Sequence, residues 1–282
     1  MSERLAKIHF PDPFDTISEE DDTLSSRLVD ARRSARVLGE LPGQLPTTLE
    51  QAYGIQAASV KRWPDDVVGW KIARLPPHDR GRFPAERLVG PVFRSFVRSV
   101  EFGCSAVGEI LDGGFAVIEA EFVLELSHSI APRRKTWSDA DIARHVSRAY
   151  CGAEVASSPM PQVIELGATA IISDLGLNTG VIVGPEITGF ASLPADAHSV
   201  RVSVDGAVVG EAQPGPIVEE PFRALRVLID HCAVHGIELP RGTLVSTGLL
   251  TGAHAVRAGS LARVDFGQFG WFEVSFEQFS RR

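Results

Sequence analysis

The chain has 282 residues, of which 44% are hydrophobic and 23% are charged, a composition typical of a globular protein with one large domain or two smaller ones. A net charge of -8 argues against nucleic-acid binding, which usually needs a basic face, and no apolar run approaches the roughly 20 residues that span a membrane. An N-terminus without an apolar stretch and only three widely spaced cysteines predict a cytoplasmic protein with reduced thiols.

The N-terminal part of the chain is predicted to contain two helices. Ser18 precedes the acidic turn EEDD, a pattern typical of a helix start because a capping side chain and negative charge both suit the positive helix end. Apolar residues then recur at helical spacing over residues 24–38, and Gly39 is expected to end this helix. A second helix is predicted to begin at Thr47 or Thr48.

From residue 67 onward, short β-like runs replace the helical pattern. They include VVGWKIA, PVFRSFV, GEILDGGFAVIEAEFVLEL, IELGATAIISD, TGVIVGPEI, RVSVDGAVVGEA, GTLVSTGLLTG, LARVDFGQFG and WFEVSF. The Asp-Gly pair at 205–206 predicts a hairpin turn. Two helices are expected within this part, near 138–150 and near 219–235, the second ended by Gly236.

This order of elements predicts an α+β fold. A small helical N-terminal region is expected over residues 1–66, followed by a β-roll catalytic domain over residues 67–282. The second domain is expected to be a mixed β-sandwich roll with a few helices.

The run FAVIEAEFVLEL, residues 115–126, carries three glutamates within an otherwise apolar segment. Because strand side chains alternate between faces, Glu119, Glu121 and Glu125 share one face, opposite a continuous apolar face. This pattern fits a half-buried strand with its polar side in water. It also fits neighbouring carboxylates that are held together by a cation. The segment alone leaves both interpretations open.

Common catalytic motifs are absent from the sequence. It contains no phosphate-binding P-loop, no dinucleotide-type glycine triplet, no G-x-S-x-G, no CxxC and no HExxH. His231 and His235 lie four residues apart on a predicted helix and could share a metal ion, but no third ligand is evident. We therefore interpret the pair as part of an ordinary helix surface.

Several segments between about residues 45 and 276 resemble one superfamily in their order and spacing. They are LPTTLEQAYGIQ, VVGWKIA, IEAEFVLEL, GAEVASSPM, LNTGVIVGPEI, TLVSTGLLTG and RAGSLARVDFGQFGWFEVSF. Together they resemble the fumarylacetoacetate hydrolase-like superfamily. The branch they resemble contains the 2-oxo-4-pentenoate (2-hydroxypentadienoate) hydratases and the 2-oxo-3-hexenedioate decarboxylases.

The resemblance implies a Mg²⁺ or Mn²⁺ ion that is bound by three carboxylates. Two would come from the E-x-E of Glu119 and Glu121, and the third best matches Glu154 in AEVASSP, with Glu165 as the competing candidate. Hard oxygen ligands of this kind select these two ions. Glu125 lies one pleat further along and is expected to face solvent or to form a salt bridge.

The resemblance also implies a catalytic lysine. VGWKIA is similar to the family motif whose lysine reaches the metal site and handles protons, which points to Lys71. A neighbouring cation and burial would both lower the pKa of this lysine. Without the resemblance, Lys71 would be an ordinary strand lysine that extends to water.

The sequence departs from the family pattern after this motif. Leu88 stands where relatives carry an acid, and Thr251 is the polar residue left to contact substrate in TGLLTGAH. The loop RLPPHDRGRFPAERLVG is rich in arginine. We expect either a solvated surface or a grip by Arg74 on a second substrate carboxylate, because a guanidinium binds carboxylates in a bidentate manner.

The function implied by the resemblance is that of a hydratase, a lyase of aromatic catabolism, that acts on a 2-oxo or 2-hydroxy-dienoic acid. A 2-oxo-enedioate decarboxylase, an acylpyruvate C–C hydrolase, or a relative that binds metal without catalysis are the alternatives. A small-molecule 2-oxo acid is the expected partner, with neither nucleic acid nor membrane, and the protein is expected to be a homo-oligomer.

Overall fold

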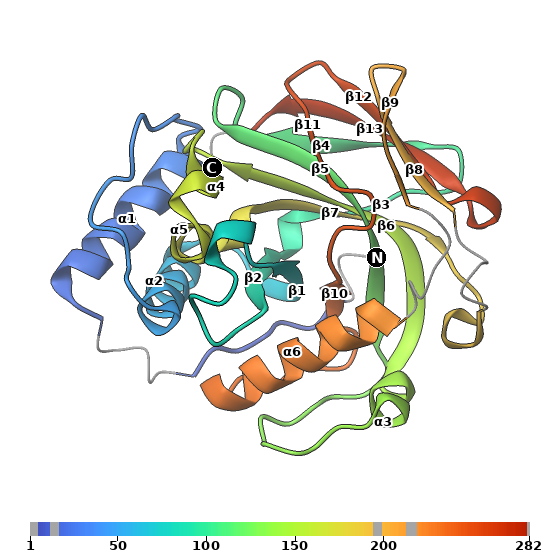
Figure 1. The fold of residues 1–282 in the computed structure, drawn as a ribbon, viewed down its shortest axis with the longest axis horizontal. Helices are drawn as coiled ribbons and strands as arrows, with labels where there is room; N and C mark the ends of the chain where they lie inside the picture. Colours follow the sequence, from blue (N-terminus) through green and yellow to red (C-terminus); the bar gives the residue numbers. More distant parts are fainter. Residues whose placement is uncertain (1–4, 12–16, 194–198, 213–218, 281–282) are drawn as a thin grey trace.

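The computed structural model describes residues 5–11, 17–193, 199–212 and 219–280 (Figure 1). Strands within these residues form two sheets. The larger, eight-stranded sheet has the order β2-β1-β10-β5-β6-β7-β3, and β11 pairs with β5 beside β10. The smaller, five-stranded sheet has the order β4-β13-β12-β8-β9. The α+β fold and its β-roll part are confirmed.

The strands of the larger sheet are β1 (Val67–Arg74), β2 (Arg87–Phe93), β3 (Val97–Ser99), β5 (Phe115–Leu126), β6 (Val146–Ser158), β7 (Asn178–Glu186), β10 (Leu244–Ser246) and β11 (Ala253–Ala255). Those of the smaller sheet are β4 (Ser105–Ile110), β8 (Val200–Val204), β9 (Ala207–Ala212), β12 (Leu261–Asp265) and β13 (Trp271–Gln278). The helices are α1 (Glu19–Arg33), α2 (Leu49–Arg62), α3 (Asp139–Arg144), α4 (Val163–Leu166), α5 (Ala168–Ser173) and α6 (Glu219–His235).

Both N-terminal helices begin where the sequence predicts. Ser18 caps α1 by accepting a hydrogen bond from the backbone N–H of Asp21 at 3.1 Å. Thr48, rather than Thr47, caps α2. The first helix ends earlier than expected, because Ala35 adopts φ +51°, a left-handed conformation that stops the helix before Gly39.

Two expectations about the middle of the chain are wrong. The helix expected near 138–150 is only α3, because the chain from Val146 onward pairs with β5 as strand β6. The run IELGATAIISD is not a strand but the short helices α4 and α5. In both segments the tertiary environment overrides a weak local preference. The hairpin at Asp205-Gly206 and the helix α6, ended by Gly236 at φ +68°, are as predicted.

The eight-stranded sheet has a core on each face. One core lies between the two sheets and α6 and includes Trp70, Phe122, Leu225 and Phe272. On the other face, α1, α2 and α5 (left in Figure 1) pack against β2 and β5 through a second cluster that includes Leu28, Ile55 and Leu88. The N-terminal helices therefore share a core with the strands, and the predicted domain division at residue 66 stays a prediction.

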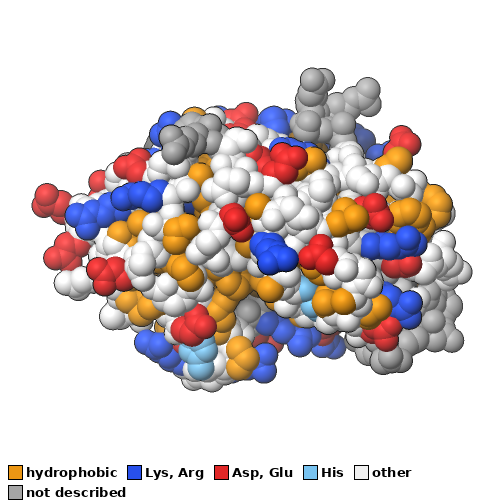
Figure 2. Space-filling model, turned by 90° about the horizontal axis from the view of Figure 1, so that it is seen from above, with side chains coloured by type: hydrophobic (Ala, Val, Ile, Leu, Met, Phe, Trp, Pro, Cys, Tyr) orange, Lys and Arg blue, Asp and Glu red, His pale blue; other side chains and the backbone are white. Residues whose placement is uncertain are grey.

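The surface of the protein mixes both signs of charge. Acidic and basic side chains are interspersed among hydrophobic ones on the face drawn in Figure 2. The cysteines Cys104, Cys151 and Cys232 are unpaired, as the sequence predicts. Among the described helices, none is both long enough and apolar enough to span a bilayer.

Candidate metal centre

Three glutamates meet on two neighbouring strands of the large sheet. Glu119 and Glu121 share one face of β5, and Glu154 of the antiparallel strand β6 is the direct register partner of Glu119. Glu119 is 8% exposed, and Glu121 and Glu154 are fully buried. Interpreting β5 as a half-buried strand with its polar face in water therefore does not hold for these residues.

The three carboxylates lie together as a group that could bind a metal ion, as the sequence predicts. One oxygen of each lies within 4.8 Å of the others. Within the described residues, Glu121 Oε1 and Glu154 Oε2 are buried without a hydrogen-bond partner, and Glu154 Oε2 lies 3.2 Å from Lys71 Nζ. Buried carboxylate oxygens without donors are costly unless a cation satisfies them. The donor set, which is made of hard oxygens, fits Mg²⁺, Mn²⁺ or Ca²⁺.

The electrostatics of the cluster also call for a cation. Burial, and secondly the charge of Glu154, raise the pKa of Glu119 to about 7. The same two causes raise the pKa of Glu121 well above its usual value. Without a metal ion, these raised pKa values favour the protonated form of both carboxyl groups. A divalent cation would remove this cost by neutralising two of the three charges.

Neighbouring residues orient the glutamates. Ser246 Oγ, on β10, and the Gly248 backbone N–H, at 3.0 Å, both donate to Glu121 Oε2. Asn178 Nδ2, at the start of β7, donates to Glu154 Oε1 at 3.0 Å, whereas Asn178 Oδ1 is buried without a partner. Sequence reasoning missed Ser246 and Asn178, although both lie in segments that carry the family resemblance, TLVSTGLLTG and LNTGVIVGPEI.

Lys71 lies in the same cluster. Its side chain is 3% exposed, on β1, and its Nζ atom is 3.2 Å from Glu154 Oε2. Burial by itself lowers the pKa of Lys71, but Glu154, Glu119 and Glu121 outweigh it, so the pKa lies above its usual value. The lowered pKa expected from the sequence depends on the positive charge of a neighbouring ion, and it stays a prediction.

Glycines allow this lysine to be enclosed. A Cβ atom on Gly90, the register partner of Lys71, would lie 3.1 Å from Lys71 Cγ and 2.8 Å from Gly176 Cα. Because neither Gly90 nor Gly176 has a side chain, their backbones approach closely, and the segment after α5 that contains Gly176 covers Lys71.

The structure also shows the contacts of the other candidate residues. Arg74 is 61% exposed and pairs with Glu220 of α6 at 2.9 Å. Thr251 Oγ1 is within 3.0 Å of His254 Nε2.

Glu165, the competing third ligand, is exposed on α4 and so is not in the cluster. Glu125 accepts a hydrogen bond from Tyr150 Oη at 2.7 Å and lies 3.8 Å from Arg148, which is the expected salt bridge.

Leu88, which stands where relatives carry an acid, is buried in the core formed with the N-terminal helices. His231 packs against Tyr53, Trp70 and His235. Within the described residues, the glutamate cluster is the one group of ligand side chains close enough to bind a metal ion.

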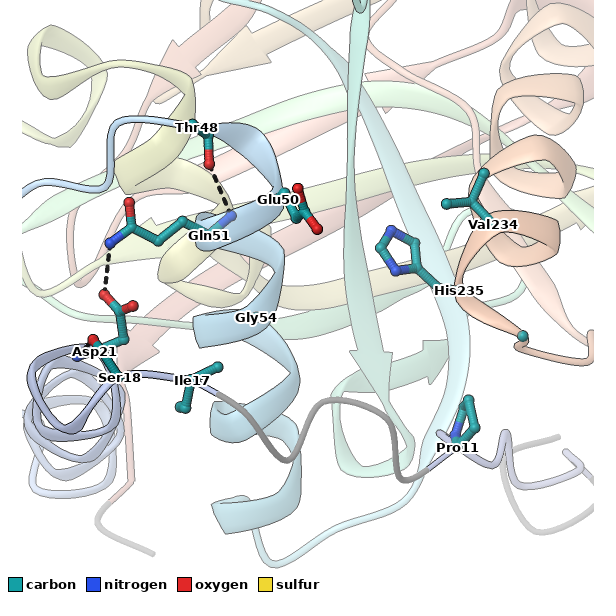
Figure 3. Close-up of a pocket in the computed structure, with 11 residues that line it drawn as sticks. Pro11, Ile17, Ser18, Asp21, Thr48, Glu50, Gln51, Gly54, Val234 and His235 are labelled. Atoms are coloured by element: carbon teal, nitrogen blue, oxygen red, sulfur yellow. Dashed lines mark hydrogen bonds between the residues drawn. The ribbon is translucent and has the colours of Figure 1, made fainter.

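A separate pocket of about 670 Å³ lies between α1, α2 and the end of α6 (Figure 3). Thr48 accepts a hydrogen bond from the Gln51 backbone, and Gln51 Nε2 donates to Asp21 at 2.9 Å, on the wall of this pocket (Figure 3). These polar groups are already used to cap and join the two helices, which is a structural role. None of the glutamates of the metal centre lines this pocket.

Comparison with known proteins rests on the fold alone. Neither a family model nor a curated protein sequence matches the chain. The solved structures of 4-oxalocrotonate decarboxylase from Pseudomonas putida G7 are similar, with a TM-score of 0.74 for both the calcium–acetate and the magnesium–adipate complex. They are 19% and 18% identical to this chain, and each match covers 93% of this chain and 99% of the other.

A more distant structure is fumarylpyruvate hydrolase from Pseudomonas aeruginosa in complex with Mn²⁺ and pyruvate. Its TM-score is 0.52 at 14% identity, and the match covers 77% of this chain and 93% of the other. The chain shares its fold with these solved structures, which are a decarboxylase and a hydrolase, and the fold expected from the resemblance is confirmed.

Proposed function

We propose that the protein is a divalent-metal-dependent hydratase that acts on a 2-oxo or 2-hydroxy-dienoic acid. The observation that carries this proposal is the buried cluster of Glu119, Glu121 and Glu154 with Lys71 Nζ 3.2 Å from Glu154 Oε2. The 4-oxalocrotonate decarboxylase and fumarylpyruvate hydrolase structures, which contain Mg²⁺, Ca²⁺ or Mn²⁺, support a metal-dependent enzyme of this superfamily.

The three glutamates would hold Mg²⁺ or Mn²⁺. A bound ion would supply Lewis-acid stabilisation of negative charge on the 2-oxo acid. Ser246, Gly248 and Asn178 keep the glutamate oxygens in place through the hydrogen bonds described above.

Lys71 holds and moves the proton. Its ammonium group pairs with Glu154 Oε2, and a cation bound by the glutamates would lower the pKa of Lys71 toward the working range of a general acid–base group. Hydration needs one proton delivered to carbon and one taken from the attacking water. A single lysine that alternates between its two protonation states serves both steps.

The same constellation serves other reactions of a 2-oxo acid. A decarboxylase of 2-oxo-enedioates or a C–C hydrolase of acylpyruvates would use the same metal and the same lysine, and the similar folds include a decarboxylase and a hydrolase. A relative that binds metal without turnover is the alternative outside enzymes. The small-molecule partner in each case is a 2-oxo acid, and we propose that the chain works as a homo-oligomer.

The test is a panel of 2-hydroxydienoates, 2-oxo-enedioates and acylpyruvates incubated with the protein and Mg²⁺. Loss of ultraviolet absorbance without carbon dioxide release identifies a hydratase or a C–C hydrolase, and analysis of the products separates these two. Carbon dioxide release identifies a decarboxylase. Activity must disappear with chelator and return with Mg²⁺ or Mn²⁺. Metal binding without turnover of any compound would instead support the non-catalytic alternative.

A further inference from the structure

A buried arginine links the N-terminal helix α1 to the strands that carry the metal centre. Arg32 lies in the last turn of α1 and is 1% exposed. Its Nε atom donates to Asp174 Oδ1 at 2.5 Å, and Asp174 Oδ2 accepts a hydrogen bond from Ser158 Oγ at 2.6 Å. Asp174 is buried to the same extent as Arg32. A buried ion pair often contributes no more stability than apolar side chains of similar volume, but it requires one defined geometry of its partners.

The guanidinium group of Arg32 also binds backbone oxygens of three neighbouring elements. Nη2 donates to Ser157 O of β6 at 2.8 Å and to Asp174 O, directly after α5, at 3.0 Å. Nη1 donates to Asn178 O, at the start of β7, at 3.4 Å. A planar guanidinium makes several hydrogen bonds of fixed direction at once, whereas an ammonium group acts as a point charge. Arg32 therefore fixes the end of β6, the end of α5 and the start of β7 relative to one another.

The turn between α5 and β7, Leu175–Leu177, has an unusual backbone. Leu175, Gly176 and Leu177 all have left-handed φ values, of +56°, +65° and +68°. This region is unfavourable for the two leucines, because their Cβ atoms crowd the carbonyl oxygen that follows. Residues in such conformations persist where the surrounding contacts impose them, and they concentrate at functional sites. Arg32 binds the residues on both sides of this turn.

The same turn contributes to the metal centre. A Cβ atom on Gly176 would lie 3.3 Å from Lys71 Cδ, so the turn covers the lysine. Asn178 directly follows the turn, and its Nδ2 atom donates to Glu154 Oε1 at 3.0 Å. The position of this amide depends on the backbone of Asn178, whose carbonyl oxygen accepts the hydrogen bond from Arg32. A continuous series of contacts therefore leads from α1 to one of the three glutamates.

We propose that Arg32 is a positioning residue of the metal centre, which holds the left-handed turn so that the Asn178 amide orients Glu154. This inference rests on the proposed function, because it concerns the metal-binding glutamates, and it gives the N-terminal helix a part in metal binding. Arg32 acts through Asn178 rather than by contact with the ion. Release of the turn would weaken metal binding although every metal ligand is still present.

Arg32→Lys tests this role, because it keeps a positive charge beside Asp174 but loses the planar guanidinium. We expect the Mg²⁺ affinity of chelator-treated protein, measured by isothermal titration, to fall by about three- to tenfold, at or below the effect of residues that touch a metal ligand. Leu24→Ala is the matched control. Leu24 is as buried as Arg32 and lies about two turns earlier on α1, so its truncation destabilises the packing of this helix and should leave the Mg²⁺ affinity unchanged.

A double-mutant cycle with Asn178→Ala shows whether Arg32 acts through this amide. Once the amide is removed, Arg32→Lys should lower the Mg²⁺ affinity by no more than about a further twofold, the usual limit for independent sites. A general effect on the fold would instead lower the affinity equally in the parent and in Asn178→Ala. Hydrogen exchange at the Leu177 N–H, which donates to Asp174 O at 2.9 Å, should become faster in Arg32→Lys, because the turn is released.

Ser158→Ala is a milder variant that serves if Arg32→Lys does not fold. It removes the hydrogen bond that Ser158 donates to Asp174 Oδ2 and leaves the charge of Asp174 paired with Arg32. The Mg²⁺ affinity should fall by about threefold in the parent background, and by less than about twofold in Asn178→Ala.

The two ways of failing are distinct. If the parent protein does not bind Mg²⁺, the proposed function fails, and the role of Arg32 in the metal centre fails with it. If the parent binds Mg²⁺ and the folded variant, Arg32→Lys or Ser158→Ala, binds it with the same affinity, the role of Arg32 alone is overturned. An equal loss in Leu24→Ala, or a loss that persists in Asn178→Ala, overturns it as well.

Discussion

Glu119 of β5 and Glu154 of β6 are direct cross-strand partners, and both are buried. Like charges that face each other across antiparallel strands destabilise a sheet. Here the cost is larger, because neither carboxylate has water around it. A cation bound by both carboxylates would offset this repulsion. The predictions about metal binding follow from this pair of residues.

Removal of one carboxylate should weaken metal binding. In Glu119→Gln we expect the affinity for Mg²⁺ to fall by about tenfold or more, because an amide oxygen replaces a charged ligand next to Glu154. Isothermal titration of chelator-treated protein with Mg²⁺ measures this change. Glu125→Gln is the matched control, since Glu125 shares the strand and the face but pairs with Tyr150 and Arg148. Equal affinities in the parent and Glu119→Gln would remove the proposed site.

Metal removal should make stability depend on pH. The pKa of Glu119 is raised to about 7 in the metal-free fold, whereas an unfolded glutamate titrates near its model value of 4.5. The folded state therefore holds more protons between these values, and metal-free stability should fall as the pH rises from about 4.5 to 7. Added Mg²⁺ should restore stability, and by more at pH 8 than at pH 5. Thermal denaturation with and without chelator measures both effects; a Mg²⁺ effect that is independent of pH would contradict the prediction.

Substitution of the lysine should separate binding from turnover. In Lys71→Ala we expect Mg²⁺ binding to be retained or tightened, since the ammonium competes with the ion for Glu154 Oε2. Turnover should fall by roughly 10²–10⁴, the usual contribution of a proton-transfer group. Steady-state kinetics and calorimetry on the same preparation measure the two properties. Turnover close to that of the parent would assign proton transfer to another group.

Asn178 should act on the metal through Glu154. In Asn178→Ala the hydrogen bond to Glu154 Oε1 is lost, and we expect the Mg²⁺ affinity to fall by about tenfold, as for other residues that orient a metal ligand. Thr179→Val is the control, because Thr179 is also buried but donates to the backbone of Val155 at 3.2 Å. The same loss in both variants would indicate general distortion of β7 rather than a role of the amide.

His231 should contribute a second pH dependence, in the opposite direction. Burial, and secondly His235, lower its pKa to about 3, whereas an unfolded histidine titrates near 6.5. Between these values the unfolded state binds more protons, so stability should fall as the pH drops below about 6.5. With Mg²⁺ present to suppress the glutamate effect, His231→Gln should flatten this acid limb in thermal denaturation. His78→Gln, at a position 49% exposed, should leave the limb unchanged.

Features that depend on neighbours along the chain can be predicted from the sequence. Ser18 and Thr48 indicate where their helices begin, because each caps its helix by accepting a hydrogen bond from a backbone N–H only three residues later. The alternation in FAVIEAEFVLEL places Glu119 and Glu121 on one face because side chains on any strand alternate. Glu154 and Lys71 are predicted as site residues only by the family resemblance. In the structure, Glu154 clusters with the two glutamates of the E-x-E, and Lys71 pairs with Glu154.

Features that depend on pairing between distant segments become visible in the folded protein. The register of β5 with β6 sets Glu154 opposite Glu119, and the same pairing turns the expected helix beyond residue 145 into a strand. Nearness to Lys71 along the chain favoured Arg74, and only the fold shows that Arg74 pairs with Glu220 of α6, more than 140 residues away. The physical reason is that burial and register arise from contacts between distant segments, and local patterns do not encode them.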